Sequence, residues 1–145
     1  MNLPSLSLSL CLLPWALSAW PAAGTAQTEE VQEWRGQYGG EEAPVAEVVT
    51  HPARLAKLCR RLDLKLPQID FKKDSAVVAH AGLRPTGGYT VEFLDPVPQG
   101  DDLLVRWRVR RPAPGSYVTQ ALTRPWKVKI FARPKGTLKV EQVKD

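Results

Sequence analysis

Cysteine is scarce in this chain. The 145 residues include only Cys11 and Cys59, and Cys11 lies in an apolar run that has no charged side chain before Glu29. If that run is removed as a secretion signal, Cys59 is the one cysteine left. An intramolecular disulfide is then excluded, even in an oxidising compartment, and the core must be held together by packing.

The first 26 residues have the pattern of such a signal. Residues 3–20 are apolar but interrupted by serine and proline, so they suit a signal better than a membrane span. Gly24 and Ala26 are the small residues that precede a cleavage site, which predicts a mature start at Gln27. Residues 1–5 lack lysine and arginine, which is unusual for a signal. We expect a signal peptide over residues 1–26, no stable span after cleavage, and a secreted, periplasmic or cell-envelope location.

Catalytic and metal-binding motifs are also missing. His51 and His80 have no histidine, cysteine or carboxylate at a metal-ligand spacing. No Gly-x-Ser-x-Gly, His-Glu-x-x-His or phosphate-loop motif occurs. The sequence therefore predicts a protein that is not an enzyme and that has no cofactor and no metal site.

One helix is predicted, over residues 50–62. Thr50 is placed to cap it, and Pro52 falls in the first turn, where a missing N–H is harmless. An apolar stripe at i, i+3, i+4 and i+7 is formed by Leu55, Leu58, Cys59 and Leu62. Because Cys59 belongs to this stripe, we expect a buried structural thiol and not a reactive one.

The rest of the chain alternates apolar and polar residues with the period of a half-buried strand. Residues 27–44 are expected to form a flexible N-terminal segment with Trp34 as an anchor, and residues 45–145 a single β domain. Strands are predicted over residues 45–49, 76–83, 89–94, 103–110, 126–131 and 138–143, with turns between them that include residues 96–100. The predicted fold class is mainly β with one helix: an antiparallel β-sandwich, of which an immunoglobulin-like arrangement is one version, or a small barrel.

The strand over residues 103–110 carries arginines on one face. They are Arg106, Arg108 and Arg110, with Arg111 beside them, and Lys127 and Lys129 are candidates for the same surface. Such a face could bind a polyanion or the cell envelope. Nucleic acid is not expected, because alternation puts Trp107 on the opposite face and leaves no aromatic residue for stacking. A solvated sheet face is the simpler explanation, and we favour it.

Two loops combine an Arg-Pro pair with an aromatic residue. Residues 82–89 read G-L-R-P-T-G-G-Y, and residues 123–126 read T-R-P-W. Proline restricts φ and glycine permits positive φ, so the first loop is expected to be a rigid turn. Loops at one end of a sandwich can form a joint binding surface. The candidate binding residues are Arg84, Pro85, Thr86, Gly87, Gly88, Tyr89, Arg124, Pro125 and Trp126. The alternative is a tight hairpin at the glycines and a core role for Trp126.

These motifs resemble the PrcB C-terminal domain family, which is named for a subunit of a bacterial protease complex. The resemblance covers about residues 47–132. It rests on Leu66-Pro67, Ile69-Asp70-Phe71, residues 82–89, the Pro-Ala-Pro-Gly of residues 112–115 and the Thr-Arg-Pro-Trp of residues 123–126. It implies an exported, non-catalytic β domain whose partner is a protein, and which assists or stabilises a protease.

A more distant resemblance is to the chagasin-type inhibitors of papain-like cysteine proteases, which are immunoglobulin-like sandwiches. Residues 84–89 are similar to their Asn-Pro-Thr-Thr-Gly-aromatic loop, with Arg for Asn and Gly for Thr, and residues 124–126 match their Arg-Pro-aromatic loop. Their middle glycine-rich loop has no good counterpart here. This resemblance implies protease inhibition as the alternative to a protease-associated binding domain, and a polyanion or cell-envelope binder is the third hypothesis.

Overall fold

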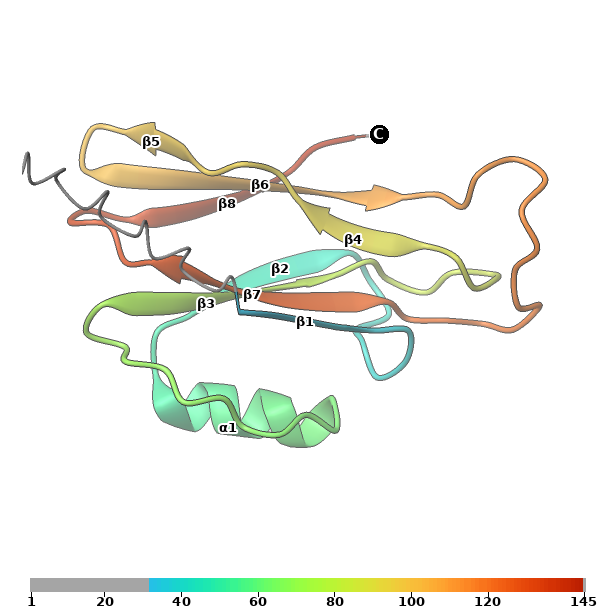
Figure 1. Ribbon diagram of the computed structural model, residues 1–145, viewed down its shortest axis with the longest axis horizontal. Coiled ribbons are helices and arrows are strands. Elements are labelled where there is room, and N and C mark those ends of the chain that lie inside the picture. Colours follow the sequence, from blue (N-terminus) through green and yellow to red (C-terminus); the bar gives the residue numbers. More distant parts are fainter. Residues whose placement is uncertain (1–31, 145) are drawn as a thin grey trace, which may run out of the picture.

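The structure is a computed structural model that describes residues 32–144, so the predicted signal peptide lies outside the described residues. Within this part the chain forms eight strands and one helix (Figure 1). In chain order these are β1 (Glu33–Gly36), β2 (Val45–Val49), α1 (Pro52–Arg61), β3 (Asp74–His80), β4 (Thr90–Phe93), β5 (Val97–Gln99), β6 (Asp102–Arg110), β7 (Trp126–Ala132) and β8 (Leu138–Gln142). Residues 32–144 contain no helix that is long and apolar enough to span a membrane.

The strands form two sheets that pack face to face, and α1 covers the outer face of the first sheet (Figure 1). The first sheet has the order β1-β7-β3-β2 and is antiparallel throughout. In the second sheet, β6 is central, with β4 and β5 along one edge and β8 along the other. The predicted β-sandwich with one helix is confirmed. Its strand order is not that of an immunoglobulin domain, because β1 pairs with β7 and not with β2.

The pairing of β6 with β8 is parallel, whereas the sequence predicted antiparallel strands. Leu103 lies opposite Leu138, and Trp107 lies opposite Gln142. Alternation of apolar and polar residues shows which face of a strand is buried, but it contains no information on the direction of the neighbouring strand. β8 pairs with residues 103–107 of β6 and ends before β6 does.

The proline-rich residues 96–100 are also not a simple turn. Residues 97–99 form the short strand β5, with Pro98 opposite Leu103 of β6. An edge strand tolerates Pro98, because a proline removes one ladder donor and only one side of such a strand is paired. The turn itself is confined to Gly100 and Asp101.

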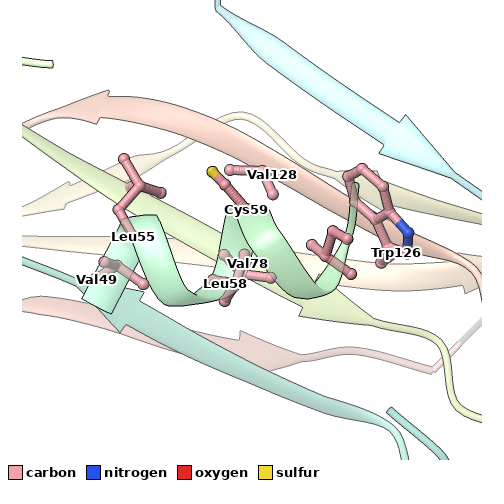
Figure 2. Packing of buried hydrophobic residues seen from close by; sticks show 9 residues of the cluster. Val49, Leu55, Leu58, Cys59, Val78, Trp126 and Val128 are labelled. Carbon is pink, nitrogen blue, oxygen red and sulfur yellow. The ribbon is translucent and has the colours of Figure 1, made fainter. Parts of the chain in front are cut away.

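The helix encloses the first of two hydrophobic clusters. Leu55, Leu58 and Cys59 are buried against Val78 and Val128 of the first sheet (Figure 2). The predicted apolar stripe is therefore confirmed, and burial raises the pKa of the Cys59 thiol.

The predicted cap at Thr50 is wrong. The N-cap is His51, whose side chain makes no capping hydrogen bond, and Pro52 follows directly. A proline disfavours helical geometry in the residue before it, so the helix begins at Pro52 with His51 still extended at φ −127° and ψ 136°.

The second cluster fills the space between the two sheets. Trp107 and Val105 of β6 are buried there with Val77 of β3. The rings of Phe93 and Phe131 meet edge to face across the sheets, with centroids 5.7 Å apart. This core fixes the ends of β3, β4, β6 and β7, and thereby positions the loops that join them.

Candidate functional site: a cationic pocket at the loop end

The loop over residues 82–89 crosses from one sheet to the other. It joins β3 of the first sheet to β4 of the second, so the hairpin alternative is wrong. Arg84 instead forms an antiparallel bridge with Thr123. The backbone N of Arg84 lies 2.8 Å from the carbonyl oxygen of Thr123, and the backbone N of Thr123 lies 2.9 Å from the carbonyl oxygen of Arg84. The Gly87 N–H donates to Thr119 C=O at 2.8 Å. The two Arg-Pro loops therefore lie side by side, and we call residues 82–89 and 111–125 together the loop end (Figure 1).

Close contacts join the two loops of the loop end around Gly88 and Thr123. The Thr123 hydroxyl donates to Thr86 C=O at 2.8 Å, and Thr123 is buried. Gly88 has φ of +81°, and a Cβ added there would lie 2.7 Å from Val118 Cγ1 and 2.9 Å from Pro112 Cβ. Glycine is required at this position both for its backbone conformation and for space.

Two of the predicted binding residues belong to the core. Trp126 is 4% exposed, and its indole Nε1 donates to Tyr38 C=O at 2.6 Å. Pro125 is also buried. The prediction of Trp126 as an aromatic anchor for a partner is wrong, because β7 begins at this residue and its side chain faces α1 (Figure 2).

Six of the predicted residues do reach the surface. They are Arg84, Pro85, Thr86, Gly88, Tyr89 and Arg124, whereas Gly87 is buried. Exposed apolar side chains occur in the same two loops at Leu83, Tyr117 and Leu122. The sequence prediction missed these three residues. The bridge of residue 84 with residue 123 sets Leu83 opposite Arg124 and Pro85 opposite Leu122, so only the pairing of the two loops reveals that Leu83 and Leu122 lie close together.

An open pocket of about 470 Å³ lies beside Arg84 at this end of the molecule. Its lining consists of Arg84, Tyr89, Val109, Arg111, Gln142, Val143 and Lys144. Three of these residues carry positive charge and none is acidic. Most of the pocket surface is polar, and Tyr89 and the two valines contribute the smaller, apolar part. Such a pocket suits a ligand that combines an anionic group with an apolar body.

Arg84 is held in the pocket by neutral groups. Its guanidinium carbon lies 5.5 Å from the centroid of the Tyr89 ring, and one Nη donates to Ala81 C=O. The Nε is buried and has no hydrogen-bond partner among the described residues. The stacked ring and the backbone bond orient the guanidinium without neutralising its charge.

The other two cations of the pocket are also without acidic partners. Within residues 32–144, neither Arg111 nor Lys144 forms an ion pair with a carboxylate. The sequence prediction missed Lys144 and Val143 as site residues. The alternation that continues to Val143 was visible, but its position beside Arg84 depends on the parallel pairing of β8.

The arginine face of β6 is different, because it contains its own counter-charge. Arg108 Nε lies 2.7 Å from Glu92 Oε2, and Arg110 lies 3.7 Å from Glu92 Oε1. The hydrogen bond from Arg108 lowers the pKa of the Glu92 carboxyl. The two lysines proposed for this surface, Lys127 and Lys129, are in β7 of the other sheet. Lys127 nevertheless lies close enough to Glu92 to contribute to the lowered pKa of its carboxyl.

Comparisons with known proteins agree with one of the two resemblances. Residues 75–131 match the model of the family described as PrcB C-terminal. The match runs from β3 into β7 and includes both Arg-Pro loops, but it does not extend to α1 or to the predicted motifs at residues 66–71. Comparisons with curated proteins and with solved structures found no match. A similarity to chagasin-type inhibitors is not shown. No group of three or more metal-ligating side chains occurs in residues 32–144. Residues 75–131, which include the loop end and parts of both sheets, are thus the part of the chain that is similar to the PrcB C-terminal family, in agreement with the resemblance of the sequence motifs.

Proposed function

We propose that this protein is an exported, non-enzymatic binding module that associates with a protease or a protease complex through the loop end. The observation that carries the proposal is the bridge between Arg84 and Thr123, which joins two distant Arg-Pro loops into one surface. The family match over residues 75–131 supports the protease context.

The composition of the loop end suits a protein partner. Arginine and tyrosine are enriched in protein interfaces, and the loop end contains both, together with the exposed apolar Leu83 and Leu122. Arg124 is exposed next to Leu122, and Tyr117 is fully exposed. The close packing at Gly88 means that little conformational freedom would be lost on binding.

The two alternative functions have less support. A chagasin-like inhibitor would need to present the aromatic residue of its Arg-Pro loop to the enzyme, but Trp126 is buried here. A polyanion site on β6 would have to compete with Glu92, which already pairs with Arg108.

Affinity capture with the full chain tests the proposal. We expect immobilised protein to recover a protease, or a subunit of a protease complex, from the secreted or envelope fraction of its native source. Leu122→Ala and Arg124→Ala should weaken this capture. Lys135→Ala, in the turn between β7 and β8 at the opposite end, is the matched control. Trp126→Ala is unsuitable, because the residue is in the core.

Two results would contradict the proposal. One is wild-type protein that recovers no protease. The other is capture that Leu122→Ala, Arg124→Ala and Lys135→Ala leave equally strong. A peptide-cleavage assay on the captured enzyme then separates a stabilising subunit from an inhibitor, since an inhibitor slows cleavage. Cell fractionation tests export, which predicts the protein outside the cytoplasm with Gln27 as its first residue.

A further inference from the structure

One edge of β6 is left unpaired next to the pocket. In an antiparallel ladder, bonded and non-bonded residue pairs alternate. Leu94 N–H donates to Arg106 C=O at 2.9 Å, so the even-numbered residues of β6 form the bonds to β4. The odd-numbered residues face the opposite edge, where Trp107 C=O accepts a bond from Val143 N–H at 2.8 Å. Among the described residues, that is the last backbone bond between β6 and the segment that follows β8.

By the same alternation, Val109 directs its N–H and C=O toward this edge. No strand of residues 32–144 pairs with β6 there, because β8 ends at Gln142 and the chain then leaves the sheet (Figure 1). Val109, Gln142 and Val143 all line the pocket. The pocket is therefore continuous with a free stretch of strand edge, which is the template that an added strand requires.

The charges around this edge indicate what kind of polypeptide segment would fit it. Arg84, Arg111 and Lys144 line the same pocket as the apolar Val109 and Val143. The last residue of a polypeptide presents a carboxylate and a side chain from one Cα, and its preceding residues have the backbone groups that a strand edge needs. An internal Asp or Glu places its carboxylate away from the backbone and supplies no apolar side chain at that point.

We propose that this pocket binds the carboxyl terminus of a partner polypeptide, which adds a short strand to the free edge of β6 at Val109. The terminal carboxylate is held by Arg84, Arg111 and Lys144, and an apolar last side chain packs on Val143 and the Tyr89 ring. This deepens the proposed function and rests on it, since the partner would be the protein that the loop end recognises. The pocket volume of about 470 Å³ is within the range usual for ligand sites, about 300–1,000 Å³.

Fluorescence polarisation with defined peptide pools tests this inference on the full chain. The first probe is a fluorescein-labelled pool of pentapeptides with four random positions and a free C-terminal valine. The second pool is identical but amidated. The third is amidated and has a glutamate at the fourth position. We expect the free-carboxyl pool to bind about tenfold more tightly than either amidated pool, since a charge-assisted contact is lost on amidation.

Variants locate the site. Arg111→Gln and Lys144→Gln should each weaken binding of the free-carboxyl pool about three- to tenfold, whereas Lys135→Gln should leave it unchanged. Arg111 and Lys144 form no ion pair within residues 32–144, so the melting temperatures of both variants should equal that of the wild type. In NMR spectra, the Val109 amide should shift on binding and exchange more slowly with solvent, which a purely ionic contact would not cause.

Several results would overturn the inference. They are equal binding of the three pools, no binding of the free-carboxyl pool at millimolar concentration, and an unprotected Val109 amide in the complex. Inorganic phosphate alone reproducing the NMR shifts would also overturn it, because the site would then be a simple anion site. Failure of the proposed function is distinguishable: if the wild type binds the free-carboxyl pool but captures no protease, the pocket is supported and the protease association is rejected.

Discussion

Gly88 provides a direct test of how tightly the loop end is packed. Its φ is +81°, and an added Cβ would lie 2.7 Å from Val118 Cγ1 and 2.9 Å from Pro112 Cβ. Gly115 also has a positive φ, of +77°, but a Cβ there would have nothing within 4 Å. Alanine substitution therefore imposes the same backbone conformation at both positions, and only Gly88→Ala adds steric overlap.

The expected losses differ for this reason. A left-handed backbone costs a residue with a Cβ about 1–2 kcal/mol, and this applies to both variants. Overpacking adds about 1–3 kcal/mol where neighbours cannot move freely, which applies at Gly88 alone. Gly88→Ala should therefore lower the free energy of unfolding by about 2–5 kcal/mol, and Gly115→Ala by about 1–2 kcal/mol.

Urea unfolding followed by tryptophan fluorescence measures both variants. A double variant, Gly88→Ala with Val118→Ala, strengthens the test, because it removes the Cγ1 atom that the new Cβ would meet. The double variant should be less destabilised than the sum of the two single variants. Equal losses for Gly88→Ala and Gly115→Ala, together with strict additivity in the double variant, would refute the claim that packing against Val118 holds the loop end.

Three further predictions concern the core. Trp126→Ala should lower the free energy of unfolding by about 3–5 kcal/mol, whereas the exposed Arg124→Ala should change it by less than about 0.5 kcal/mol; near-equal urea midpoints would contradict the core role of Trp126. Burial, with a smaller contribution from Arg61, lowers the pKa of His80, so the unfolded chain binds a proton more readily. The contribution of His80 to the free energy of unfolding should therefore be fully present above about pH 6.5 and decrease as the pH falls below it. Urea midpoints at pH 7.5 and 5.5 would show this decrease, and equal midpoints would contradict it. The Cys59 thiol should react with a thiol reagent only at the rate of unfolding, because it is buried and its pKa is raised; fast reaction of the native protein would contradict this.

Features that depend on local periodicity were predictable. The helix stripe through Leu55 and Cys59 and the alternation through Trp107 were each confirmed, because the periods of helix and strand appear directly in the order of residues. The similarity to the PrcB C-terminal family was recognisable for a similar reason, since it rests on short runs of consecutive residues such as the one around Pro85.

The position of the helix start shows a limit even at the local level. Thr50 has a good capping side chain, but the proline two residues later determines the boundary and makes His51 the cap. The restriction that Pro52 places on the backbone of His51 outweighed a capping hydrogen bond from Thr50, which would be worth about 1 kcal/mol.

Residues of the loop end are the clearest case of non-local control. The sequence alone explains why residues 82–89 form a rigid turn, but it does not show that this turn crosses between sheets. The bridge from Arg84 to Thr123 spans a long stretch of chain, and the burial of Trp126 follows from which face of β7 meets α1. The bridge has no signature in the neighbouring residues, whereas the alternation over residues 126–131 already allowed the core role of Trp126 that the sequence left open.

What the sequence by itself determined is six of the eight strands within residues 32–144, the one helix, their apolar faces and the Arg-Pro motifs, since all of these are encoded in short windows. Only the tertiary structure decided the direction of β8, and with it the free edge at Val109 and the position of Lys144 beside Arg84. The physical reason is that the same alternation buries the same side chains whichever way a neighbouring strand runs, so the partner and its direction are determined by the packing of the whole domain.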